Sequence, residues 1–304
     1  MFGRVHRQQV RGMIGGLLCV ATPLMAQGDG LKLYISADME GVVGAVTGDQ
    51  LGPGGFEYGR FREFMTNEVL AAIRGARAAG VTEILISDSH GNGENLLIEL
   101  LPADVMVVRS WPRPLMMMEG IDSTFDAAIF LGYHSGTTYM EGVRAHTMSS
   151  ARLTDVRLNG TSMPEAGISA AIAGHFGVPI IMISGDDAAV AEAQSIIGDI
   201  EGAVVKWNYG FHAAKSLTPA AAYTLIEETT RAAIVRLNEF QPHVIATPVT
   251  LDMRFKSYRP PELLDYLPIV TRIDSHAIQY VAENMIAVSK FIEFVMNYEV
   301  GLEP

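Results

Sequence analysis

The sequence predicts an α/β protein: a mostly parallel sheet covered by helices, with a smaller α+β second domain. Three observations carry this prediction. Several short segments are apolar throughout, and segments of helical period separate them. After about residue 200 the pattern of predicted strands and helices changes. Strands that are apolar on both faces are typical of parallel sheets covered by helices on both sides. With 304 residues, of which 49% are hydrophobic, the chain can bury a sizeable core.

The first domain is expected to span residues 27–200 and to bind metal. Its predicted strands are 31–37, 83–87, 105–109, 127–132 and 179–184. Its predicted helices are 58–79, 164–176 and 188–197, because apolar residues recur there with helical period. Pro164 in the first turn of the second helix supports that boundary.

The second domain is expected to span residues 201–304. A strand is predicted at 203–207, an amphipathic helix at 218–237, a strand at 243–255 and a long helix at 274–297. Strands and helices of this kind indicate a small α+β unit. We also consider an arrangement in which the last helix packs back on the first domain.

Residues 1–26 have the pattern of a secretory signal peptide. Arg4, Arg7 and Arg11 precede the short apolar run Met13–Ala21, and Ala26 is a suitable cleavage point. The alternative is a membrane anchor, but the run is short of the roughly 20 residues that cross a bilayer. The mature protein is therefore expected to be periplasmic or secreted, with no membrane attachment after cleavage.

The composition of the mature chain excludes several kinds of site and partner. Cys19, the single cysteine, lies within the signal, so any metal must be held by histidines and carboxylates. Removal of the signal leaves 19 basic residues against 34 acidic ones, a net charge of about −15. This charge argues against nucleic acid and anionic membranes as partners.

Polar side chains follow four of the predicted strands directly. The four segments are Asp38-Met39-Glu40, Asp88-Ser89-His90, Tyr133-His134-Ser135 and Gly185-Asp186-Asp187. Ligands bind outside the carboxyl ends of the strands in an open parallel sheet, so these side chains should converge on one edge.

The residue types at this edge favour a metal site. Asp38 and Glu40 are two residues apart, and two neighbouring carboxylates raise each other's pKa unless a cation compensates them. His90 and His134 add imidazoles, which are common zinc ligands. Each residue also has a simpler interpretation: Asp38 could cap a turn, Glu40 could be solvated, and either histidine could be a hydrogen-bonded structural residue.

Three further positions remain open on residue type alone. Glu165 could be a ligand or could interact favourably with the helix dipole in the first turn of its helix. Asp186 and Asp187 could belong to the site or cap the next helix. His146 could be a catalytic base or a polar loop residue.

Jointly, several segments identify a resemblance to a known family. They are Asp38-Met39-Glu40-Gly41, Asp88-Ser89-His90, Met118-Glu119-Gly120, Phe130-Leu131-Gly132-Tyr133-His134, Glu165 with Gly167, and Gly185-Asp186-Asp187. In order and spacing, roughly from residue 31 to 189, they resemble the bacterial D-aminopeptidases of the dipeptide-transport operon. These are binuclear zinc peptidases. The later part of the chain resembles the family more loosely.

The resemblance implies two zinc ions per chain and assigns residue roles. It implies metal ligands at Asp38, Glu40, His90, His134 and Glu165, with Asp38 bridging the two ions. It places His146 where the family carries a catalytic histidine. It further implies small peptide substrates and a ring-shaped homo-oligomer that encloses the sites. The family type is cytoplasmic, so the predicted signal peptide here departs from it and points to periplasmic peptides.

The expected function is hydrolysis of the amide bond next to an amino-terminal D-residue such as D-Ala, by a metal-activated water. One alternative is another two-metal hydrolase, an amidase or a phosphoesterase, although no P-loop or arginine cluster for phosphate is visible. Another is a periplasmic binding protein with a structural metal, which would be fully ligated, whereas a catalytic metal keeps an open position.

Overall fold

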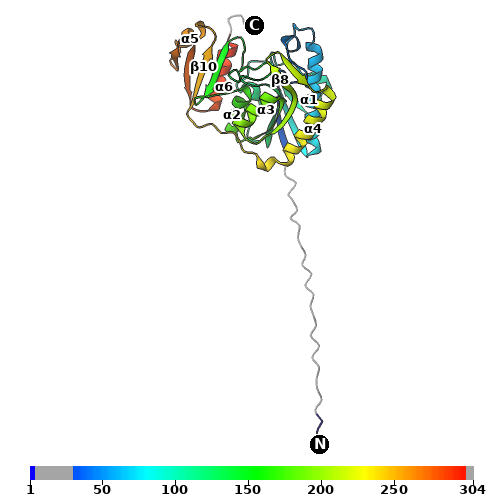
Figure 1. Ribbon diagram of the computed structural model, residues 1–304. Helices are drawn as coiled ribbons and strands as arrows, with labels where there is room; N and C mark the ends of the chain where they lie inside the picture. Colours follow the sequence, from blue (N-terminus) through cyan, green and yellow to red (C-terminus); the bar gives the residue numbers. More distant parts are fainter. Residues whose placement is uncertain (4–29, 299–304) are drawn as a thin grey trace.

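The computed structural model describes residues 1–3 and 30–298, which include two β-sheets flanked by helices (Figure 1). Residues 4–26 of the predicted signal peptide therefore lie outside the described residues. Within the described ranges, no helix is long and apolar enough to cross a membrane.

The larger sheet has seven strands in the order β3-β2-β1-β4-β7-β8-β9. All neighbours are parallel except β8 and β9, which are antiparallel. The strands are β1 Leu31–Ala37, β2 Val81–Asp88, β3 Met106–Val108, β4 Ala127–Tyr133, β7 Ile180–Asp186, β8 Glu201–Gly210 and β9 Ala213–Ser216. β4 and β7 are buried along their whole length. The fold class predicted from uniformly apolar strands is confirmed.

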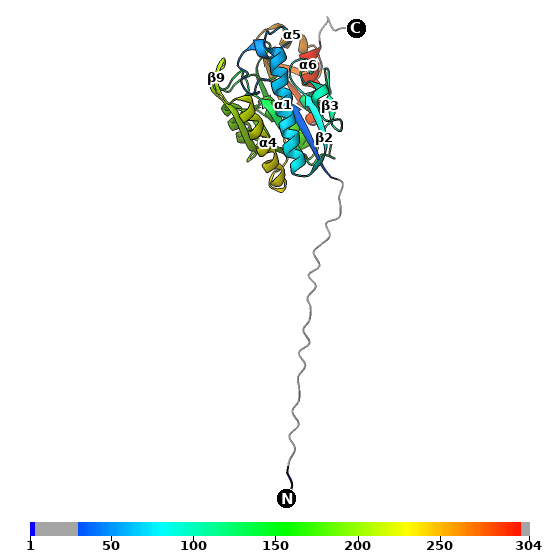
Figure 2. The same ribbon diagram turned by 90° about the vertical axis from the view of Figure 1, so that its right-hand side faces the viewer.

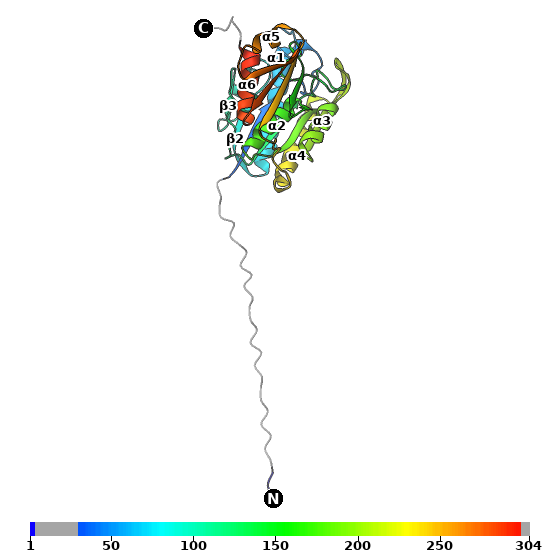
Figure 3. The same cartoon turned by 90° about the vertical axis from the view of Figure 1, so that its left-hand side faces the viewer.

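Helices cover both faces of this sheet. On one face α1 (Tyr58–Ala78) and α4 (Pro219–Val235) lie side by side (Figure 2). Their close approach depends on Gly75, because a Cβ atom there would lie 2.2 Å from the carbonyl oxygen of Glu227. α2 (Glu165–His175) and α3 (Asp187–Ile197) cover the other face (Figure 3).

The smaller sheet has five strands in the order β11-β12-β10-β5-β6, all antiparallel. Its strands are β5 Leu153–Leu158, β6 Thr161–Ser162, β10 Val249–Phe255, β11 Val270–Asp274 and β12 Ala277–Ala282. α5 (Arg259–Leu264) contacts β11 and β12. α6 (Met285–Asn297) contacts β10 and β12 on one side and α2 on the other, so it joins the two sheets. Short 3-10 helices lie at Gly48–Gln50, Ile98–Leu100, Met116–Met118 and Leu237–Glu239.

Two sequence-based element predictions were wrong in the later part of the chain. The helix predicted at 274–297 begins only at Met285, where the Asn284 side chain caps it by accepting a hydrogen bond from Ala287 N at 3.0 Å. The preceding segment forms β12, because it pairs along its length with β10. The strand predicted at 243–255 begins at Val249, since Pro248 has no amide N–H for a sheet ladder.

Sheet membership does not follow the order of the sequence. β5 and β6 were not predicted; β6 pairs with β5, and the other partner of β5 is β10, about ninety residues further along the chain. Conversely, β8, β9 and α4 belong to the larger sheet and its covering layer, so the change of sheet does not fall near residue 200. The division into domains 27–200 and 201–304 stays a prediction.

Candidate metal site

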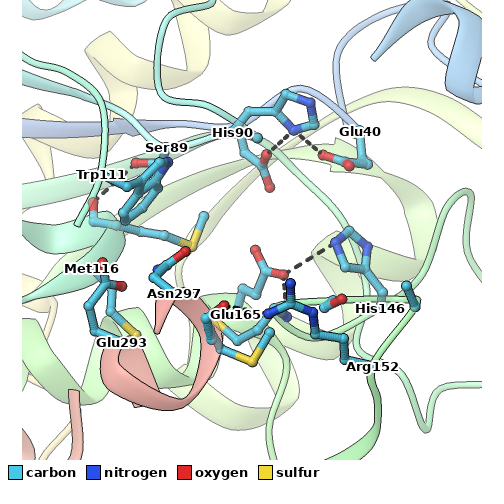
Figure 4. Close-up of a pocket in the computed structure, with 17 residues that line it drawn as sticks. Glu40, Ser89, His90, Trp111, Met116, His146, Arg152, Glu165, Glu293 and Asn297 are labelled. Carbon is cyan, nitrogen blue, oxygen red and sulfur yellow. Dashed lines mark hydrogen bonds and ion pairs between the residues drawn. The ribbon is translucent and has the colours of Figure 1, made fainter. Parts of the chain in front are cut away.

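Three adjacent strands deliver the polar residues that the sequence predicted to converge. Asp38 and Glu40 follow β1, His90 follows β2 and His134 follows β4, and in the sheet β1 lies between β2 and β4. Glu165 is the first residue of α2. The five side chains are buried together at the carboxyl edge of the larger sheet, and several of them are visible in Figure 4.

Two glycines allow the loops after β1 and β4 to touch. Gly41 N donates to Gly132 O at 2.6 Å, and a Cβ atom on Gly41 would lie 2.0 Å from Tyr133 O. Gly132 has φ 67°, and a Cβ atom there would lie 2.2 Å from Asp38 O. Side chains at these two positions would push the loops apart, and with them Asp38 and His134.

Asp38 lies between two groups of possible ligands. Its Oδ1 is 3.1 Å from His90 Nδ1, which is also 2.8 Å from Glu40 Oε2. Its Oδ2 is 3.3 Å from His134 Nε2, which is also 3.5 Å from Glu165 Oε2. The structure therefore has the arrangement in which one carboxylate can serve two neighbouring cations.

The backbone fixes which nitrogen of each imidazole faces the cluster. His90 Nε2 is 2.6 Å from Leu51 O, His134 Nδ1 is 3.0 Å from Ser135 O, and His146 Nδ1 is 2.9 Å from Arg144 O. A carbonyl oxygen can only accept, so each of these nitrogens donates. The opposite nitrogen of each ring then faces the carboxylates and, once deprotonated, can bind a metal, which is how metal-binding histidines are usually oriented.

Burial and crowding of charge perturb the pKa values in this cluster. Burial raises the pKa of Asp38, and the nearby charge of Glu40 raises it further. Burial alone would lower the pKa of His90 and of His134. The carboxylates of Glu40 and Glu165, respectively, outweigh it and hold both pKa values well above the usual value. Without a cation, protons on the imidazoles must therefore compensate the buried carboxylates.

Three buried polar atoms of the cluster test whether a metal would fit. Asp38 Oδ2, Glu40 Oε2 and His134 Nε2 have no hydrogen-bond partner among the described residues. Buried polar atoms are nearly always satisfied, and exceptions call for a missing partner. Two divalent cations, one beside Glu40 and one beside His134, would satisfy all three atoms. Oxygen and nitrogen donors without cysteine suit zinc.

His146 lies beside the predicted ligands. Its Nε2 is 3.5 Å from Glu165 Oε1, and together with His134 and Glu165 it forms a second group of potential ligands within 4.8 Å of one another. Its side chain is 16% exposed, against 1% for that of His134. It is the more accessible of the two imidazoles, as a group that exchanges protons with a substrate must be.

Buried carboxylates fix the loop that carries His146. Glu192 Oε2 accepts from Gly136 N at 2.7 Å, and Asp186 Oδ2 accepts from Val143 N at 2.5 Å. Asp186 also caps α3 by accepting from Ala189 N at 2.8 Å, which confirms the capping interpretation of this residue. His146 N donates to Ser135 O at 3.0 Å, so the loop returns to the end of β4.

A cavity of about 560 Å³ opens onto the cluster. Besides the predicted ligands it is lined by residues that no sequence pattern singled out, among them Trp111, Met116, Met148, Glu293, Met296 and Asn297 (Figure 4). They come from segments far from the ligands in the sequence, including α6, which packs on the smaller sheet. A cavity of this size accommodates a short peptide.

Lys206, in β8, is a further residue that the sequence analysis missed. Its side chain is fully buried, and its Nζ donates to the carbonyl oxygens of Glu40, of Val42 at 3.1 Å and of Ala45 at 2.6 Å. Burial lowers its pKa to about 8. The available signal was a single lysine within the apolar run of residues 203–207, since lysine is almost never fully buried without partners.

The fold and the site define the class of this protein as an α/β protein with a buried carboxylate–imidazole metal site. The chain belongs to the D-aminopeptidase family, peptidase family M55, whose profile matches residues 31–294. The resemblance derived from the sequence is thereby confirmed.

Two comparisons show how far this similarity extends. The chain is 33% identical over 257 residues to a D-aminopeptidase of Bacillus subtilis (strain 168), which covers 84% of this chain and 93% of that protein. The fold is similar to that of the Zn-dependent D-aminopeptidase DppA from Bacillus subtilis, a self-compartmentalizing protease. The TM-score is 0.83 at 31% identity, with 88% of this chain and 99% of that chain covered.

Proposed function

We propose that this protein is a two-metal aminopeptidase that hydrolyses peptides with an amino-terminal D-residue such as D-Ala. The observation that carries the proposal is the buried cluster around Asp38, whose two carboxylate oxygens each lie beside a different histidine, His90 or His134. Membership of the D-aminopeptidase family and similarity to a Zn-dependent member support the substrate class and the metal.

The ligand assignment follows the two groups. Asp38, Glu40 and His90 would hold one zinc ion, and Asp38, His134 and Glu165 the other. When bound, ions in such a site act as Lewis acids that polarise a carbonyl group and lower the pKa of water. The protein's own contribution is to keep the two imidazoles in the right tautomer through Leu51 O and Ser135 O.

His146 would move the proton that hydrolysis requires. Water adds to the carbonyl carbon, the C–N bond breaks, and the leaving amine must gain a proton. His146 Nδ1 is held by Arg144 O, so its Nε2 faces the cavity and can accept a proton from water and return it to the amine. The apolar side chains of Trp111, Met116 and Met148 line the same cavity and limit the entry of bulk water.

A panel of matched substrates tests the function. Purified protein loaded with zinc is assayed on D-Ala and L-Ala peptides of the same sequence, on the N-acetylated D-peptide, and on a phosphate ester. We expect turnover of the free D-peptide alone, or faster turnover of it than of every other substrate. Faster cleavage of the L-peptide would refute the stereochemical preference, and cleavage of the phosphate ester alone would refute the peptidase.

We propose also that the chain forms a closed, ring-shaped homo-oligomer. The support is its similarity to a self-compartmentalizing protease over 99% of that chain. Light scattering coupled to gel filtration is the test: a mass equal to one chain at assay concentration would contradict the proposal.

Export to the periplasm or the medium is a further part of the proposal. Its support is the arginine-flanked apolar run at residues 4–21 with Ala26 as cleavage point. Amino-terminal sequencing of the protein from its native host should find a start near Gln27. A start at Met1 in the cytosolic fraction would contradict it.

A further inference from the structure

Lys206 places a positive charge next to the backbone that carries two assigned metal ligands, but it contacts neither of their carboxylate groups. Its strand, β8, is separated from β1 in the sheet by two strands, β4 and β7. Its Nζ donates to three carbonyl oxygens of the segment that follows β1, those of Glu40, Val42 and Ala45. That segment carries two of the ligands assigned above, Asp38 and Glu40.

We propose that Lys206 is a positioning residue that sets the metal affinity of the Asp38–Glu40–His90 group. It acts as a tethered cation that holds the segment 38–45 in the curve from which both carboxylates face the site. The inference rests on the two-metal function proposed above. It concerns a residue that neither contacts the substrate cavity nor supplies a ligand atom.

The number of N–H donors on an ammonium group matches the number of carbonyl oxygens in this curved segment. Three carbonyl oxygens converge on one buried point, and an ammonium has three N–H donors. A water molecule has only two, and it would leave one carbonyl without a donor. The carboxylates of Asp186 and Glu68 lie close enough to interact with the charge of Lys206, so the ammonium is stabilised from more than one side.

The second ligand group depends on other contacts. Glu165 is held by α2 and by Met148 N, which donates to its Oε1 at 2.7 Å. His134 is held by β4 and by Ser135 O. Loss of Lys206 should therefore lower the metal affinity of the Asp38–Glu40–His90 group most. The other group depends on the segment after β1 through Asp38 alone.

Metal titration of three proteins tests this selectivity. Metal-free full-length wild type, Lys206→Met and Lys215→Met are titrated with zinc against a competing chromogenic chelator. Lys215 is the matched control: it lies on the adjoining strand β9, is exposed, and its Nζ is 4.5 Å from the ring centroid of Trp207. We expect one of two sites to weaken by at least about tenfold in Lys206→Met, as for other residues that orient metal ligands, and no change in the control.

Chemical rescue separates positioning from a general loss of packing. Lys206→Ala leaves space where the side chain was, and methylammonium or ethylammonium can supply the missing N–H donors. We expect either ion to restore zinc affinity, and tetramethylammonium, which has no N–H, to leave it unchanged at the same ionic strength. This arm also serves if Lys206→Met does not fold, because thermal unfolding with and without the amine is measured on the same sample.

The outcomes separate this inference from the proposed function. Wild type that binds fewer than two ions contradicts the two-metal site, whatever the variants do. Wild type with two sites and a folded Lys206→Met with unchanged affinities would overturn the role of Lys206 alone. Equal weakening of both sites, or rescue by tetramethylammonium, would also overturn it.

Discussion

The rings of His134 and His146 stack face to face, with centroids 4.1 Å apart and an interplanar angle of 8°. Their Nε2 atoms each lie 3.5 Å from Glu165, one from each carboxylate oxygen. Only His134 is also within 3.3 Å of Asp38. The two histidines thus share a carboxylate but differ in their access to the residue between the ligand groups, and different roles follow.

The first prediction concerns His146→Ala. The variant should lower kcat by at least roughly 10²-fold, as expected for loss of a general acid–base group. Metal content and folding should stay intact, because Asp38, His134 and Glu165 remain to hold the ion on that side. Elemental analysis and steady-state kinetics check both parts. Loss of metal would make His146 a ligand, and near-normal turnover would leave it a polar loop residue.

Removal of a predicted ligand, unlike removal of His146, should cause loss of the metal as well as of activity. His90→Ala is expected to lose metal together with activity, because it deletes the nitrogen that lies 3.1 Å from Asp38 and 2.8 Å from Glu40. His134→Ala should do the same. His212→Ala, at an exposed position after β8, is the control for histidine replacement. A His90→Ala protein with two bound ions would refute the ligand assignment.

Chelation provides a prediction that needs no mutation. Exhaustive treatment with a strong chelator should abolish activity, and added zinc should restore it, because the ions supply the Lewis acid that polarises the carbonyl group and lowers the pKa of water. Elemental analysis of the untreated protein should give two ions per chain. Activity that survives complete removal of metal would exclude a metal-dependent mechanism.

The buried carboxyl group of Glu68, which is not an assigned metal ligand, should make the stability of the protein depend on pH. It is buried in α1, and burial raises its pKa to about 7. The folded state therefore binds a proton more tightly than the unfolded state, in which the pKa is close to 4.5. The stabilisation from this proton is fully present below about pH 4.5 and is lost as the pH rises through about 7.

Glu68→Gln tests this effect, because the amide cannot ionise but its oxygen can still accept from Val43 N. Relative to wild type, the variant should gain on the order of 1–3 kcal/mol between pH 4.5 and pH 8 in its free energy of unfolding. Guanidinium denaturation of both proteins at each pH gives the difference and cancels the titration of other groups. A difference independent of pH would contradict the prediction.

The sequence was sufficient to predict the central sheet and the convergence of the site. Uniformly apolar strands separated by helices require parallel pairing, and parallel strands place their carboxyl ends at one edge. Asp38, Glu40, His90 and His134 each follow such a strand, so their meeting depends on strand direction more than on packing detail. Local signals also located Pro164 at the start of α2 and offered Asp186 and Asp187 as candidate caps of α3, of which the structure has Asp186.

Only the tertiary structure decided the rest, because the local sequence of these segments does not say which distant segment they contact. The pairing of β5 with β10 is one such contact, and it determines where the smaller sheet begins. The walls of the cavity, to which Trp111 contributes together with Glu293 and Asn297 of α6, are another. Lys206 is the clearest case: its role exists only because β8 lies beneath the curve after β1, where three carbonyl oxygens meet one ammonium.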